Sequence, residues 1–68
     1  MGSKMVGAAN AMVDMAVQGV QVTSDGTATH RAAEERLMGM YELLSAMQVY
    51  EPRLKAVTER AATALYPE

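Results

Sequence analysis

Polar residues in the first third of the chain recur every three or four positions. On a helix this spacing forms one narrow polar stripe, and apolar residues cover the rest of the circumference. The stripe consists of Asn10, Asp14, Gln18 and Gln21. We therefore expect a helix over about residues 3–20, with Ser3 as its N-cap. Residues 17–23 are also rich in β-branched side chains, but a single short strand would have no pairing partner in this chain.

Turn-forming residues separate this first helix from the rest of the chain. Residues 23–27 contain an Asp-Gly pair. This pair favours a turn, because glycine adopts positive φ without steric cost and aspartate bonds its own backbone. A second helix should follow over about residues 28–50, and either Thr27 or Thr29 can act as its N-cap.

The second predicted helix has a clear apolar period. Five apolar residues recur at alternating spacings of four and three, which is the 3.5-residue period of a helix-packing seam. They are Ala33, Leu37, Met40, Leu44 and Met47, and Tyr41 and Leu43 flank them. Most of the polar residues of this segment fall away from the seam, so we expect the seam to be the packed side of the helix.

Pro52 interrupts the helical pattern near the end of this segment. Proline removes a helix hydrogen bond and biases the preceding Glu51 away from helical angles, whereas it suits the first turn of a new helix. A third helical segment should span about residues 52–65, and Pro52 either separates two helices or kinks one. The apolar stripe of this segment is Leu54, Val57, Ala61, Ala64 and Leu65. The expected fold class is therefore all-α, a helical hairpin with a short third segment after Pro52.

The composition indicates a core that is weak for a single copy. Half of the 68 residues are apolar, but none is Phe, Trp or Ile, and seven are methionine. One small domain over residues 1–68 normally needs disulfides, a metal or oligomerisation for stability. The lack of cysteine and the single histidine exclude disulfides, thiolate metal sites and multi-histidine sites. Because the first helix is apolar over most of its circumference, we expect two copies to form a dimeric helical bundle.

The charge pattern narrows the classes of partner and the compartment. The net charge is −2 and no basic block occurs, which argues against nucleic-acid binding. The polar stripe of the first helix lacks Lys and Arg, which argues against a helix on a membrane surface, and the segment is too polar to span a bilayer. The absence of cysteine and of a visible signal peptide favours a cytoplasmic location.

One group of polar residues has the residue types of a hydrolytic site. Asp25, Thr27, Thr29 and His30 supply a carboxylate, hydroxyls and an imidazole. All of them lie at a turn or a helix start, where such side chains cap the backbone, and we interpret them in this way. Glu34 follows His30 by four residues, but two ligands from one chain make a weak metal site. We therefore expect no enzymatic activity, no cofactor and no metal.

The sequence favours a function in protein–protein interaction. Methionine is flexible and polarisable, and it suits surfaces that adapt to a partner. We predict a small interaction module, such as an adaptor, docking or inhibitor protein, that binds itself as a homodimer or higher oligomer and also binds a larger protein. The alternative is a structural subunit of a larger assembly, such as a virus particle or filament. The predicted interaction surface comprises Met12, Val13, Ala16, Val20, Leu37, Met40, Tyr41, Leu44, Met47, Leu54 and Val57.

Overall fold

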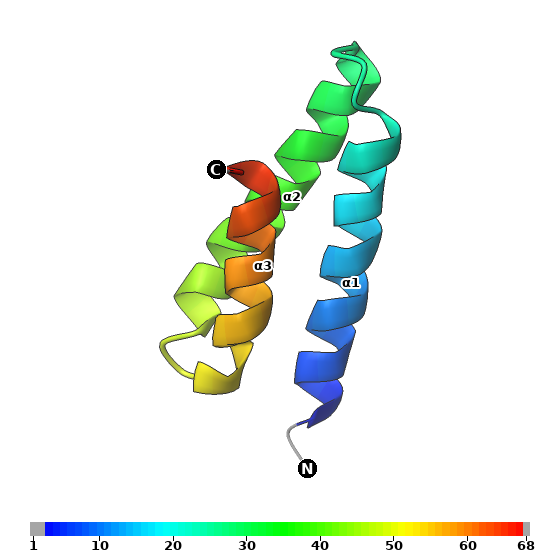
Figure 1. The fold of residues 1–68 in the computed structure, drawn as a ribbon. Coiled ribbons are helices and arrows are strands. Elements are labelled where there is room, and N and C mark those ends of the chain that lie inside the picture. The colour runs from blue at the N-terminus through cyan, green and yellow to red at the C-terminus, as the bar shows by residue number, and fades with distance from the viewer. Residues whose placement is uncertain (1–2, 68) are drawn as a thin grey trace.

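Within residues 3–67, three α-helices run alternately in opposite directions (Figure 1). The structure, a computed structural model, describes residues 3–67 and comprises α1 (Ser3–Val22), α2 (Ala28–Met47), the 3-10 turn η1 (Pro52–Leu54) and α3 (Lys55–Leu65). This part of the chain contains no strand, so the expected all-α fold is confirmed. No helix within it combines the length and the apolarity needed to cross a membrane. The Ser3 side chain, predicted as an N-cap, lies outside the described part.

The connection between α1 and α2 is a tight turn that makes the two helices antiparallel. α1 ends two residues later than the predicted residue 20. Gly26 has a φ of +78°, a conformation that glycine adopts without the penalty of a Cβ atom. Of the two threonines that could cap α2, Thr27 does so, because its side chain accepts a hydrogen bond from the backbone N–H of His30.

Pro52 separates two helices instead of kinking one. Glu51, which precedes it, has φ −132° and ψ 87°, away from helical angles as the following proline requires. α2 therefore ends at Met47, three residues before the predicted end, and the backbone N–H groups of Tyr50 and Glu51 both donate to the Met47 carbonyl at 2.9 Å. This turn directs α3 back along the hairpin (Figure 1).

All three helices contribute to one core. Leu37 of α2, Leu54 of η1 and Ala61 of α3 are completely buried, and Val13 of α1 is almost so. The buried apolar set is Val13, Ala16, Ala33, Leu37, Leu44, Leu54, Val57 and Ala61. Many of these side chains are small, which allows the helices to approach closely. A single chain thus forms a core of its own.

The third helix covers only part of the hairpin. α1 and α2 have 20 residues each, or about 30 Å of helix, whereas α3 has 11 residues, or about 16 Å. The molecule is accordingly elongated, with extents of 40 × 20 × 18 Å. α3 packs against one side of the hairpin and does not reach the opposite side.

Candidate docking surface on the hairpin

An open apolar groove of about 240 Å³ lies between α1 and α2. It is lined by Met5, Ala8, Ala9, Met12 and Val13 of α1 and by Met40, Leu43, Leu44 and Met47 of α2. None of these side chains is charged, and none offers a conventional hydrogen-bond donor. We call this feature the methionine groove, after the four methionines that line it. Its chemistry suits an apolar occupant.

The methionine groove follows from the spacing of residues on the two helices. Met5 and Met12 of α1 are seven residues apart, with the lining alanines Ala8 and Ala9 between them, and this spacing places all four on one face. Met40 and Met47 of α2 have the same spacing, with two leucines between them. Because the hairpin is antiparallel, the first half of α1 lies against the second half of α2, and the two faces meet. The alanines are too short to fill the space between the longer side chains, so a hollow remains.

Several large side chains of this surface are exposed to solvent. Leu43 is 60% exposed and Met12 is 55% exposed. Met15, one turn further along α1, is 73% exposed, and it lines an adjoining recess with Met12, Arg36 and Met40. The apolar surface therefore continues from the methionine groove along α1. Contiguous exposed apolar surface of this kind is typical of an interaction site.

The polar stripe of α1 lies on the side of the helix away from the methionine groove, and two of its residues contact α3. Arg60 of α3 forms an ion pair with Asp14, in which Nη2 and Oδ1 are 2.9 Å apart, and also donates to the Asn10 carbonyl at 3.0 Å. Most of the stripe is exposed to solvent, and part of it also contacts α3. Apolar side chains on the far side of α1, such as Met12 and Met15, are also exposed.

Six of the eleven residues predicted as an interaction surface lie in the core of the single chain. They are Val13, Ala16, Leu37, Leu44, Leu54 and Val57, each at most 7% exposed. Within this set only Val13 and Leu44 also line the methionine groove. The seam that was expected between two chains is therefore largely the seam among the three helices of one chain.

The other five predicted residues lie nearer the surface. Met12, Met40 and Met47 line the methionine groove, whereas Val20 and Tyr41 are half-buried against the core. The lining residues that the sequence prediction omitted are Met5, Ala8, Ala9 and Leu43. The signal for the three α1 residues was the apolar circumference of the first helix, which is wider than a single packing seam requires. The signal for Leu43 was its position beside the apolar seam of the second helix.

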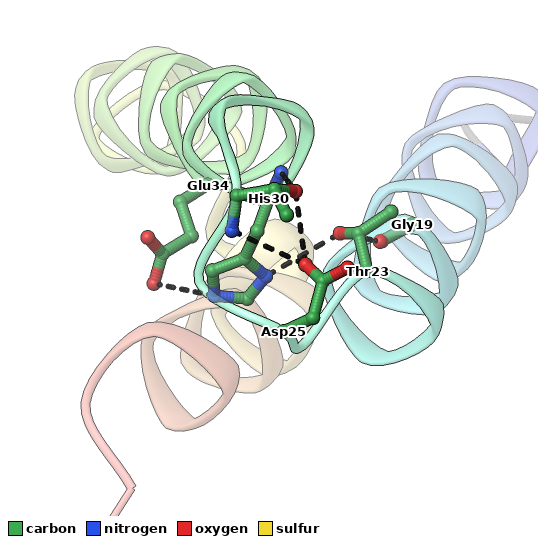
Figure 2. A network of polar contacts seen from close by, with 6 residues as sticks. Gly19, Thr23, Asp25, His30 and Glu34 are labelled. Carbon is green, nitrogen blue, oxygen red and sulfur yellow. Dashed lines mark hydrogen bonds and ion pairs between the residues drawn. The ribbon is translucent and has the colours of Figure 1, made fainter.

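Polar residues between α1 and α2 form a network that fixes the hairpin turn (Figure 2). Asp25 Oδ1 accepts hydrogen bonds from the backbone N–H of Thr27 at 3.2 Å and from its hydroxyl at 2.9 Å. The Nδ1 atom of His30 lies 3.3 Å from Thr23 Oγ1, and its Nε2 atom lies 3.5 Å from Glu34 Oε2. The network thus connects the end of α1 to the first turns of α2.

The directions of these hydrogen bonds suit capping better than catalysis. The Thr23 hydroxyl donates to the Gly19 carbonyl at 2.6 Å, whereas an activated nucleophile would donate to the imidazole. Hydrogen bonds from the hydroxyl and then the backbone N–H of Thr27 hold the pKa of the Asp25 carboxyl below its usual value. Among residues 3–67 there is no group of three or more His, Cys, Asp or Glu side chains that could hold a metal ion.

Two arginines are paired with carboxylates of the same chain. Arg53 contacts Glu51 through Nη2 at 2.7 Å and through Nε at 3.0 Å. This bidentate pair lowers the pKa of the Glu51 carboxyl and raises the pKa of the Arg53 guanidinium. Arg60 is paired with Asp14. The charges of these two arginines are therefore locally compensated, which reduces their value as a basic surface.

The methionine groove is the strongest candidate for a functional site in the described part of the chain. The polar network at the hairpin turn has the contacts expected of a helix cap, whereas packing within the chain leaves the groove open. Comparisons of the chain with protein-family models, with curated proteins and with solved structures found no match.

Proposed function

We propose that this chain is a small, non-enzymatic interaction module that docks another polypeptide in the methionine groove. The observation that supports this most strongly is a groove with an entirely apolar lining, in which Met12 and Leu43 are more than half exposed. Removing apolar surface from water is favourable by roughly 25 cal/mol per Å². A groove that offers a partner no hydrogen bond selects an apolar partner surface, because a polar one would lose its water without compensation.

The shape of the site favours a helical partner surface. The methionine groove lies between two antiparallel helices, and a helix placed over it would extend the arrangement toward a four-helix bundle. Such a helix would present apolar residues at positions i, i+3 or i+4, and i+7. The flexible side chains of Met5 and Met12 would adjust to the shape of those residues.

The non-enzymatic part of the proposal concerns the hairpin turn, where the residue types of a hydrolytic site occur. The Asp25 carboxylate accepts two hydrogen bonds from Thr27, and the Thr23 hydroxyl donates to a backbone carbonyl. These groups already have structural partners. We therefore assign the network to stabilisation of the hairpin that carries the methionine groove.

Site-specific photo-crosslinking tests this function. A photoreactive diazirine amino acid would replace Met12 or Leu43 in the groove, and in a matched control would replace Tyr50, which is 90% exposed at the α2–α3 turn. After illumination in the native cell, we expect covalent adducts with polypeptides from positions 12 and 43 and few from position 50. No adducts from the groove positions, or equal adducts from all three, would contradict the proposal. Circular dichroism of each purified variant checks that the helices are intact.

A further inference from the structure

We infer that the polypeptide in the methionine groove is a second copy of this chain. The two copies would be related by a two-fold axis, so that their α1–α2 hairpins pack face to face. Four helices would then share one apolar layer, with each α3 on the outside. This inference rests on the proposed function, because it names the occupant of the same groove.

The chain exposes more surface than a compact protein of its mass does. The solvent-accessible area is 4809 Å². A compact monomer of 7.3 kDa should expose about 4,200 Å². The chain therefore exposes about 600 Å² more than that size law gives, and covering one side with a standard interface, ~800 Å² per partner, would remove this excess. Its structural origin is the elongated hairpin, of which α3 covers one side only.

The shape of the exposed hairpin side is compatible with a copy of itself. A two-fold interface requires one surface patch to fit itself, so the patch must contain both projections and hollows. Met12, Met15 and Leu43 are large and mostly exposed, and the hollow of the methionine groove lies beside them. A projecting side chain of one copy can therefore enter the hollow of the other, and symmetry repeats the contact in the reverse direction.

The residues that line the groove add no electrostatic repulsion to this contact. Each copy carries a net charge of −2, but all nine residues that line the methionine groove are uncharged. Arg36, in the adjoining recess, is exposed and can stay hydrated at the rim of the interface. No uncompensated charge has to be buried when two hairpins meet through their groove residues.

Sedimentation equilibrium with three variants tests the inference. The wild-type chain should approach twice its mass of 7.3 kDa as concentration rises. Leu43→Lys and Met12→Lys should each raise the dissociation constant at least about thirtyfold, because a buried lysine would have no partner in the apolar groove. The matched control is Val49→Lys, since Val49 is 77% exposed on the α2–α3 turn, and it should leave the dissociation constant unchanged.

A second measurement locates the interface without changing a groove residue. The chain contains no cysteine, so a nitroxide label on the exposed Ala46→Cys position of α2 would be unique. This chain would be mixed with an unlabelled chain that carries ¹³C-methyl methionine. The label should broaden the signals of Met12 and Met47 in the other copy and should spare Met38, which contacts Tyr66 of the C-terminal region.

The outcomes separate the inference from the function on which it rests. A dimer that both lysine variants dissociate, with broadening confined to the groove methionines, supports the second copy. A strictly monomeric chain with photo-adducts to other proteins at positions 12 and 43 would overturn the second copy and leave the docking function standing. A dimer that survives both lysine variants, or that broadens Met38, would also overturn the inference. An absence of position-dependent photo-adducts would count against the docking function itself.

Discussion

The two sides of the α1–α2 hairpin differ in what covers them, although apolar residues at helical spacing form both. On one side, Leu54 and Val57 pack against Leu37 and Val13, and all four are nearly inaccessible to water. On the other side lies the methionine groove, which is open in a single chain. One apolar side is therefore closed by the chain itself and the other is not.

The residue types on the two sides differ in a way that matches this difference in cover. Leucine, valine and alanine predominate on the covered side, and their few rotamers specify one packing arrangement. Four of the nine residues that line the groove are methionines, and their flexible side chains accept more than one arrangement. We interpret the covered side as the part that stabilises the fold and the open side as the part available to a partner.

The largest expected effect distinguishes the two sides by stability. Leu54→Ala removes a completely buried side chain and should lower the free energy of unfolding by about 2–5 kcal/mol. Leu43→Ala, the matched change on the open side, should alter it by less than about 0.5 kcal/mol when the chain is dilute enough to be monomeric. Urea denaturation of both variants measures this. Equal losses would mean that Leu43 is packed within a single chain.

A smaller effect tests the free space on α2 near the groove. A Cβ atom at Gly39 would meet no group from another part of the chain within 4 Å. Gly39→Ala should therefore stabilise the isolated chain by about 0.5–1 kcal/mol through helix propensity. Gly26→Ala is the control of opposite sign, since its positive φ disfavours a Cβ atom. Thermal unfolding of a dilute sample measures this change. A lower melting temperature for Gly39→Ala than for wild type would contradict the prediction.

An effect of similar size should appear in the way the free energy of unfolding depends on the concentration of the chain. If a second copy covers the open side, each tenfold increase in chain concentration above the dissociation constant should raise the stability by about 0.7 kcal/mol per chain, because two chains share the binding free energy. Leu43→Lys should abolish this dependence. Urea midpoints over a dilution series provide the measurement, and a wild-type midpoint that stays constant would count against the second copy.

The smallest expected effect concerns the turn that joins α1 to α2. The pKa of Asp25 is held below its ordinary value of 3.8 by hydrogen bonds from Thr27. Its ionised form is therefore favoured by folding, so its contribution to stability is complete above pH 3.8 and is lost as pH falls through the lower pKa of the folded state. Asp25→Asn should lose less stability than wild type when the pH is lowered through this range. Denaturation at several pH values measures this difference. An equal loss of free energy of unfolding in both proteins would contradict the prediction.

Local chemistry made some features predictable from the sequence. The Asp-Gly turn and the threonine cap depend on residues within a few positions of each other, and the structure has both. The break at Pro52 was also visible, because proline restricts the residue before it. Whether the chain then continued or reversed could not be decided, since that depends on packing between α3 and the hairpin.

Packing between distant segments explains what the sequence did not show. The spacing of Leu37 and Leu44 correctly marks a buried stripe, but periodicity does not reveal which element covers it, and in this structure the covering element belongs to the same chain. Asp14 belongs to the polar stripe that the sequence predicts, but spacing along the chain does not reveal its ion pair with Arg60, which lies far along the chain. Met5 and Met12 lie on a side of α1 where the groove is lined by α1 and α2 alone.

Sedimentation equilibrium of the unmodified chain, compared with Leu43→Lys at the same concentrations, tests most directly whether the open side of the hairpin is a self-docking surface. We expect the wild-type mass to rise from 7.3 kDa toward twice that value with increasing concentration, and the variant to stay at the mass of one helical chain. A wild-type chain that remains at 7.3 kDa up to high concentration, or a variant that dimerises as well as wild type, would contradict this interpretation.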